Sequence, residues 1–220
     1  MKSIWIVGIL ALAIAGFAYW YFTTEPTTDA IVLIAGSVPG NAPYQDTPVL
    51  PKSFNQPDGA VFSYSAWILF NDFTTGYGNR RKVFSKGGSP AVFLDSTSNS
   101  LIVEVETFGA TESVLIPNIS ALKWIHLGIV VNQQAADIYV NGTLRQHHTF
   151  AQLPKQNDGG FTAGPGWNGV LGKVSYYPRA LSYVEMFRLS KQEPPPDLAR
   201  TISPPNYFDI TWYTGRLNSS

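Results

Sequence analysis

The sequence predicts an all-β domain, a sandwich or a barrel with one short helix, preceded by a single N-terminal transmembrane helix. Residues 4–22 carry no charged side chain. From residue 61 to residue 177, strand-length apolar segments follow one another with short polar turns between them. Many short strands with a single helix are typical of sandwiches and barrels.

The uncharged run, IWIVGILALAIAGFAYWYF, has 19 residues, close to the roughly 20 that a helix needs to cross a bilayer. Aromatic side chains that favour the membrane–water interfaces lie at both ends, namely Trp5, Tyr19, Trp20 and Tyr21. Lys2 precedes the run, and Lys52 is the next basic residue after it. The positive-inside tendency therefore predicts a single-pass membrane protein with residues 1–3 in the cytoplasm and the domain on the opposite side. A cleavable signal peptide is the alternative, because ALA and AIA within residues 11–15 resemble cleavage sites.

Composition limits the chemistry that the chain can perform. Charged residues make up 14% of the chain, and 15 basic residues balance 15 acidic ones without forming a basic stripe. Nucleic-acid binding therefore lacks its electrostatic footprint. The absence of cysteine excludes thiolate chemistry and cysteine-based zinc sites, and favours a reducing compartment or a bacterial envelope. Asn118, Asn141 and Asn218 begin glycosylation triplets, which arise often by chance.

Residues 23–60 are rich in Pro, Gly, Asn and Ser, which predicts an extended stalk. Residues 30–35 (AIVLIA) are an exception and could form a first strand. The domain itself is then expected over residues 61–192. Within it, residues 63–70 (SYSAWILF) are apolar on both faces, so we expect a strand covered on both sides. Residues 101–106 (LIVEVE) alternate as a strand with one wet face does, and residues 125–131 (IHLGIVV) resemble a central strand.

The strongest local signal is Asn141-Gly142, which lies between two strand-like segments and favours a two-residue type I′ hairpin turn. Residues 170–177 follow as the last core strand. Ser182 and Glu185 then have the spacing of a capping box, which predicts a short helix that ends near Leu189.

The tail, residues 193–220, begins with three consecutive prolines after Glu193, which favour an extended chain. Further along, Phe208, Ile210 and Trp212 alternate with polar residues, as in a strand with one apolar face. We interpret these three residues as a candidate partner-binding stripe, with packing against the chain's own domain as the alternative.

Several segments together resemble a known family. Residues 62–68 (FSYSAWI) look like the opening strand of laminin-G-like, concanavalin A-like domains. Residues 123–131 (KWIHLGIVV) and 137–142 (DIYVNG) resemble their central hairpin, and residues 177–185 (YPRALSYVE) resemble their closing strand and helical turn. The resemblance implies a two-sheet antiparallel jelly-roll sandwich. Residues 81–87 (RKVFSKG) and 118–124 (NISALKW) look most like the versions in large DNA viruses of algae and protists.

The same superfamily includes lectins, adhesion modules, glycoside hydrolases and virion proteins, so the fold does not fix the function. Glu104 and Glu106 share a strand face at a spacing that two-carboxylate hydrolysis could use. The hydrolase relatives, however, have a Glu-x-Asp-x-x-Glu run, and here the third acid is replaced by Gly109. A wet strand face explains the pair, and we predict that the protein is not an enzyme.

Histidines and aspartates offer weaker sites. His126 lies inside an apolar strand and is interpreted as a core residue with a satisfied hydrogen bond. His147 and His148 are adjacent on a strand, point to opposite faces and cannot share a metal. We therefore predict no cofactor. Calcium is the one candidate ion, through loop acids such as Asp72, Asp95 and Asp158, although turn chemistry explains each of these equally well.

Sugar binding would require an exposed aromatic platform beside polar side chains. Tyr77 with Asn79 and Trp167 with Asn168 are the best candidates, and ordinary packing is the alternative for each pair.

These observations predict a non-catalytic structural protein of the virion, of the minor capsid type. It would link the virion inner membrane to the capsid proteins of the shell. The alternative is a membrane-displayed lectin-like or adhesion module that binds glycans.

Overall fold

The computed structural model describes residues 8, 10, 12–16, 29–47, 50–51 and 59–196. Residues 12–16 are helical. The elements that follow in the described part are β1 (Ile31–Pro39), β2 (Tyr44–Asp46), β3 (Val61–Phe70), β4 (Arg81–Lys86), β5 (Ala91–Leu94), β6 (Leu101–Glu106), β7 (Thr111–Ile116), β8 (Trp124–Asn132), β9 (Ala135–Val140), β10 (Thr143–Thr149), β11 (Phe161–Ala163), β12 (Gly169–Tyr177) and the helix α2 (Tyr183–Lys191).

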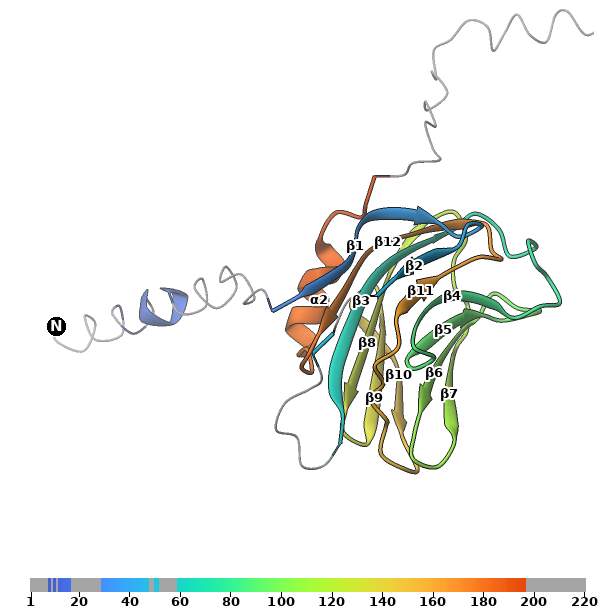
Figure 1. Ribbon diagram of the computed structural model, residues 1–220. Helices are drawn as coiled ribbons and strands as arrows, with labels where there is room; N and C mark the ends of the chain where they lie inside the picture. The colour runs from blue at the N-terminus through green and yellow to red at the C-terminus, as the bar shows by residue number, and fades with distance from the viewer. Residues whose placement is uncertain are drawn as a thin grey trace, which may run out of the picture.

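The strands form two six-stranded sheets packed face to face (Figure 1). Sheet A has the order β1-β12-β3-β8-β9-β10, and sheet B has the order β2-β11-β4-β5-β6-β7. All of their pairings are antiparallel. The predicted all-β, two-sheet antiparallel sandwich is therefore confirmed.

The core lies between the two sheets and is rich in large side chains. Alternation places Leu101, Val103 and Val105 of β6 in the core, while the glutamates between them face water, as the sequence predicted. Aromatic rings fill the centre: Tyr64 packs 5.2 Å from Tyr176, measured between ring centroids. Because both sheets present continuous apolar faces, the sandwich needs no disulfide to hold it together.

Strand β3 is buried along its entire length. Its inward face contributes Ile68 and Phe70 to the core, and neither is exposed to solvent (both 0%). Its outward face carries Ser63, Ser65 and Trp67, which are buried as well. The prediction that this strand is covered on both sides is confirmed.

The helix α2 lies across the outer face of sheet A (Figure 1). Met186, the fully buried residue of the helix, packs with Val130, Tyr139, Tyr177 and Leu181. Met186 can approach because β8 has a glycine below it: a Cβ at Gly128 would lie 2.2 Å from the Met186 sulfur. The predicted capping box is confirmed, since Ser182 and the Glu185 side chain satisfy each other's backbone N–H groups.

The predicted hairpin is also confirmed. Val140 pairs with Thr143, which leaves Asn141 (φ 53°) and Gly142 (φ 78°) as the two turn residues. Both lie in the left-handed region that a type I′ turn requires. The Asn141 carboxamide oxygen also accepts a hydrogen bond from the backbone N–H of His126 at 2.9 Å. The turn is therefore tied to β8 by a side chain as well as by strand pairing.

The domain starts earlier than the sequence predicted. Residues 30–35 do contribute to a first strand, because β1 pairs with β12 along sheet A. Residues 44–46 form β2, which pairs with β11 at the edge of sheet B. The possible first strand is confirmed, and the proposed stalk is wrong for residues 36–46, because β1 extends to Pro39 and β2 follows it. Residues 23–28, 48–49 and 52–58 of that segment lie outside the described residues.

We expect Gly142→Val to lower the free energy of unfolding by about 1–3 kcal/mol, because a β-branched residue is strained at positive φ. A Cβ at this position would also lie 2.4 Å from the hydroxyl oxygen of Ser190 on α2. Asn141→Gly keeps the backbone permissive and removes one hydrogen bond, so it should cost only about 1 kcal/mol. Chemical denaturation of the two variants checks this order, and an unchanged midpoint for Gly142→Val would contradict it.

Candidate functional site

Three loops meet at one end of the sandwich and form the candidate site. They connect β3 to β4 (residues 71–80), β5 to β6 (residues 95–100) and β11 to β12 (residues 164–168), and we call them the rim loops. The first loop bonds to both others: the N–H of Asn71 donates to the carbonyl of Asn168 at 3.0 Å, and the N–H of Gly78 donates to the carbonyl of Ser96 at 2.8 Å. The β3–β4 loop projects at the right-hand end in Figure 1, away from the start of β1.

Asp72 organises the first loop through its carboxylate. One oxygen accepts the backbone N–H groups of Thr74 (2.9 Å) and Thr75 (2.7 Å), and the other accepts a hydrogen bond from the carboxamide of Asn168. Partial desolvation of Asp72 opposes ionisation, but the hydrogen bonds from Thr75, Asn168 and Thr74 outweigh it and lower its pKa to about 2. The carboxylate is therefore ionised at neutral pH and fixes the loop against the third rim loop.

Arg81, at the start of β4, holds the first and second rim loops together. Its side chain is buried, and its Nη1 donates to the carbonyls of Phe73 and Thr75, each at 2.8 Å. Its Nη2 donates to the carbonyl of Asp95 in the second rim loop. Burial lowers the pKa of Arg81, while the nearby charges of Asp95 and Asp72 oppose that shift. One cation thus joins two loops that are separate in the sequence.

The exposed surface of the rim is polar and aromatic. Tyr77 is 61% exposed, and Asn79 beside it is exposed as well. Asn168 is half-buried, and its carboxamide is occupied by Asn71 and Asp72. The rim therefore keeps Tyr77 and Asn79 as its accessible candidate ligand-binding residues.

The expectation for Trp167 is wrong. Its ring is fully buried, with its centroid 5.0 Å from that of Phe70, so it cannot form an exposed platform. Gly40 lies against its face, where a Cβ would come within 2.4 Å of the indole. Trp167 instead fixes the third rim loop to the core, the packing alternative left open for it.

The two carboxylates considered for hydrolysis are each paired with a cation. Glu104 lies 2.6 Å from an Nη of Arg80 and accepts a hydrogen bond from Ser113. Glu106 lies 3.1 Å from Nζ of Lys155. Both are on the outer face of sheet B, in agreement with a wet strand face. Each carboxylate is thus held by a partner on the sheet surface, and ion pairing accounts for its position there.

The calcium candidates do not come together. Asp95 accepts hydrogen bonds from its own loop, chiefly from the Ser98 hydroxyl at 2.7 Å, and these lower its pKa. Asp158 lies in the loop between β10 and β11, whereas Asp72 and Asp95 belong to the rim loops. Among the residues that the structure describes, no three His, Cys, Asp or Glu side chains are grouped as a metal site would require.

The side chains of the three histidines have separate partners and form no common site. His126 is buried, and its Nε2 is 2.8 Å from the Ser65 hydroxyl, whereas its Nδ1 has no partner within the described residues. Burial lowers the pKa of His126 to about 4, so it is neutral at pH 7. His147 pairs with Asp137, and His148 reaches across to Glu112 of sheet B. The prediction that His147 and His148 point to opposite faces is confirmed.

Other predicted positions fall outside the described residues. These are the anchor aromatics Trp5, Tyr19, Trp20 and Tyr21 and the tail stripe of Phe208, Ile210 and Trp212. Over the part of the chain that is described, no helix is long and apolar enough to span a bilayer.

Sequence reasoning missed two organising residues. Arg81 was noted only within a family-like segment, and Arg179 only within the closing turn. The sequence offers one signal for Arg81, since it is the first residue of a strand and lies at the end of a long polar loop. A cation at that position predicts carbonyl or carboxylate partners in neighbouring loops.

We expect Asp72→Ala to lower the free energy of unfolding by about 1–3 kcal/mol, because hydrogen bonds to a charged group are lost. The ionised carboxylate stabilises the fold above its unfolded pKa of about 3.9, and this contribution disappears as the pH falls through the folded value of about 2. The difference between wild type and Asp72→Ala in urea titrations should therefore shrink between about pH 4 and pH 2. A difference that persists undiminished at the lower pH would refute this role.

Known proteins share this architecture. The binding domain of Paraclostridial Mosquitocidal Protein 1 superimposes with a TM-score of 0.56 at 16% identity, covering 76% of this chain and 46% of that one. The botulinum neurotoxin type G receptor binding domain gives 0.55 at 17% identity, covering 76% and 45%, and the receptor binding domain of botulinum neurotoxin D gives 0.57 at 13% identity, covering 73% and 47%.

The chain thus spans less than half the length of these structures. At such identities the likeness establishes the fold alone. No curated protein matches the sequence. A family model, by contrast, matches residues 39–185, which include most of both sheets and the start of α2. The chain belongs to the concanavalin A-like lectin/glucanases superfamily.

Proposed function

We propose that this protein is a non-catalytic binding module, held at a membrane by residues 4–22, whose rim loops engage a partner. The observation that carries the proposal is the construction of the rim. Exposed Tyr77 and Asn79 lie on a loop whose shape is fixed from behind by Asp72 and Arg81. A binding site needs accessible contact groups on a preorganised support, and the rim combines both.

The composition of the rim supports this function. The three loops are rich in Asn, Ser, Thr and Gly, contain an exposed tyrosine and hold one basic residue, Arg80, which pairs with Glu104. Tyrosine supplies a large contact area at low entropic cost, and Ser, Gly and Asn supply adaptable hydrogen bonds, as in antibody binding loops. The superimposed toxin domains, by their titles, are binding domains. Catalysis is disfavoured, because Glu104 and Glu106 are both engaged by cations.

The membrane part of the proposal rests on the uncharged run. The described positions of that run are helical, and Leu10, Leu12 and Ile14 are each more than half exposed. A helix that presents apolar side chains without a charged face suits an apolar surrounding such as lipid. Together with the interfacial aromatics of the sequence, these positions support a single-pass anchor with a cytoplasmic N-terminus.

Within this function, we favour a virion component of the minor capsid type that links the inner membrane to the protein shell. The family-like segments over residues 81–87 and 118–124 support it. The second candidate is a membrane-displayed glycan-binding module. The exposed ring of Tyr77 beside the carboxamide of Asn79 favours that alternative, because sugars pack on aromatic faces and bond to amides.

Variants of the rim test the binding function. Tyr77→Ala combined with Asn79→Ala should weaken partner binding by about 5- to 30-fold, as truncation of contact residues worth about 1–2 kcal/mol does. Phe108→Ala is the matched control, because Phe108 is also an exposed aromatic (70%) but lies between β6 and β7, outside the rim. The measurement is pull-down of the full-length chain from membranes or particles, with the neighbours identified by photo-crosslinking from residue 79.

A glycan array probed with the detergent-solubilised protein separates the two candidates. Binding that Tyr77→Ala abolishes would favour the lectin, whereas crosslinks to shell proteins without glycan binding favour the virion component. Equal effects of the rim and control variants would contradict the rim as the binding site.

The anchor is tested independently by fractionation. The full-length protein should remain in the membrane pellet after alkaline carbonate extraction and should retain its N-terminal peptide in mass spectrometry. Recovery of a mature chain that starts near Gly16 would show that the run is a cleaved signal peptide.

The tail is a proposed second contact, through Phe208, Ile210 and Trp212. Truncation after Pro196 should leave the melting temperature of the domain nearly unchanged and abolish retention on the partner. If the stripe instead pairs with its own sandwich, truncation would expose a sheet edge and apolar surface, and the melting temperature would fall by several degrees.

A further inference from the structure

The N-terminal segment enters the sandwich at the end opposite to the rim loops. β1 begins at Ile31, paired with Tyr176, and ends at Pro39, paired with Val170. Because β12 begins directly after the third rim loop, the start of β1 lies a full strand away from the rim. Nine residues at about 3.3 Å each place about 30 Å between the two ends.

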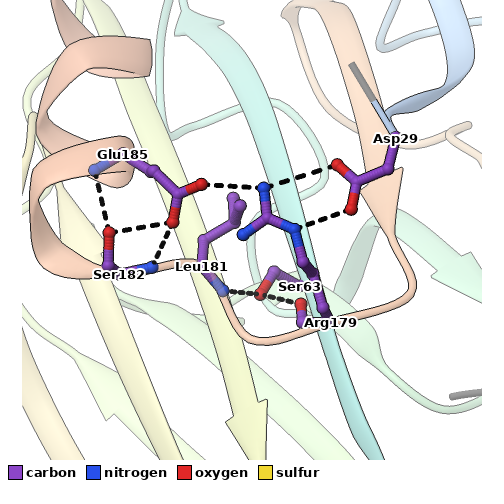
Figure 2. A network of polar contacts seen from close by, with 6 residues as sticks. All are labelled: Asp29, Ser63, Arg179, Leu181, Ser182 and Glu185. Carbon is purple, nitrogen blue, oxygen red and sulfur yellow. Dashed lines mark hydrogen bonds and ion pairs between the residues drawn. The ribbon is translucent and has the colours of Figure 1, made fainter. Parts of the chain in front are cut away.

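A partly buried polar network fixes this entry point (Figure 2). The guanidinium of Arg179 binds both carboxylate oxygens of Asp29, through Nε at 2.6 Å and Nη2 at 3.4 Å. The same Nη2 donates to Glu185 at 2.7 Å, and the other oxygen of Glu185 caps the helix at Ser182. We call Asp29, Arg179 and Glu185 the entry joint.

The joint is attached to the body of the domain as well. The hydroxyl of Ser63 on β3 donates to the carbonyl of Arg179 at 2.8 Å and accepts the N–H of Leu181 at 2.9 Å. Ala30 packs against the apolar cluster beneath α2. The direction in which the chain meets the domain at Asp29 is therefore set by sheet A and α2 together.

Very little chain separates the joint from the apolar run. Phe22 ends the run, and Asp29 lies seven residues later. A fully extended chain covers at most about 3.6 Å per residue, so Asp29 lies within about 25 Å of the end of the run. This reach is shorter than the sandwich is long. The expected stalk of 38 residues, 23–60, would have allowed about five times that distance.

We propose that the entry joint seats the domain at the membrane surface and turns the rim loops away from it. The inference rests on the proposed anchor and adds the orientation of the module. The surface that meets the lipid headgroups is the end that carries Asp29 and Arg179. The rim then presents Tyr77 about 30 Å or more above that surface, so the partner is a macromolecule on the far side, not the lipid.

Fluorescence quenching on vesicles tests this orientation, and the absence of cysteine makes single labels straightforward. Gln134→Cys lies in the turn between β8 and β9, at the entry end, and Thr97→Cys lies on the rim. Residues 97 and 134 are both exposed, so a label can be attached at either position. The full-length protein, labelled at one position, is reconstituted in phosphatidylcholine vesicles with a rhodamine-labelled lipid as the acceptor.

The label at residue 134 should be quenched at least about twofold more than the label at residue 97, because about 30 Å of strand separates the two ends. Asp29→Asn removes the ionic link to the entering chain and keeps the contact between Arg179 and Glu185. It should bring the two quenching values together without changing the melting temperature of the domain.

Equal quenching at both positions in the wild type would overturn the orientation, and an unchanged ratio in Asp29→Asn would overturn the role of the joint. An asymmetry that requires phosphatidylserine would assign the seating to surface charge and overturn the joint as well. Failure to float with the vesicles would overturn the anchor itself, and the inference with it. Flotation thus reports on the proposed function, and the quenching ratio reports on the orientation.

Discussion

The structure depends on the burial of β3 on both faces. A strand that is buried on both sides needs a cover on each, and a two-layer sandwich supplies only one. Sheet B covers the inner face, and α2 covers the sheet from outside through Met186. The helix can lie there because its N-terminus is capped by Ser182 and Glu185 and because Gly128 leaves room for the Met186 side chain. The two ends of the sandwich are each organised by a different arginine, Arg81 at the rim and Arg179 at the entry end.

At the rim, hydrogen bonds from Arg81 hold the loops together. Arg81 loses solvation on burial, and the three carbonyls that accept its hydrogen bonds compensate for that loss. Removal of such a cation would leave those carbonyls unsatisfied and the loops without a common attachment. The rim can therefore vary its outward residues without losing its shape. At the entry end the corresponding cation is Arg179, whose pKa is raised by hydrogen bonding to Glu185 and Asp29.

Features carried by local sequence could be predicted. The alternation in β6, the Asn141-Gly142 turn and the Ser182 cap depend on residues within a few positions of each other, and all three are present. The buried position of Trp167 depends on Gly40 and Phe70, which are remote in the sequence, so composition alone suggested a surface loop. The stalk prediction failed because the strands in this segment also depend on partners that are remote in the sequence. Residues 31–46 belong to a proline-rich segment that looks extended, and extended chain becomes a strand only where β12 and β11 offer partners.

The length of the connection before Asp29 bears on how the proposed module would work. A long stalk would let the domain sample many orientations and would lower the effective concentration of its binding surface at any one place. In the proposed anchored module, a short connection that ends in an ion-paired network would remove most of that freedom before any partner arrives. Less orientational entropy would then be lost on binding, and a polar rim could support a useful affinity. The low fraction of charged residues is compatible with the proposed arrangement, because a domain held close to its target would not depend on electrostatic steering to find it.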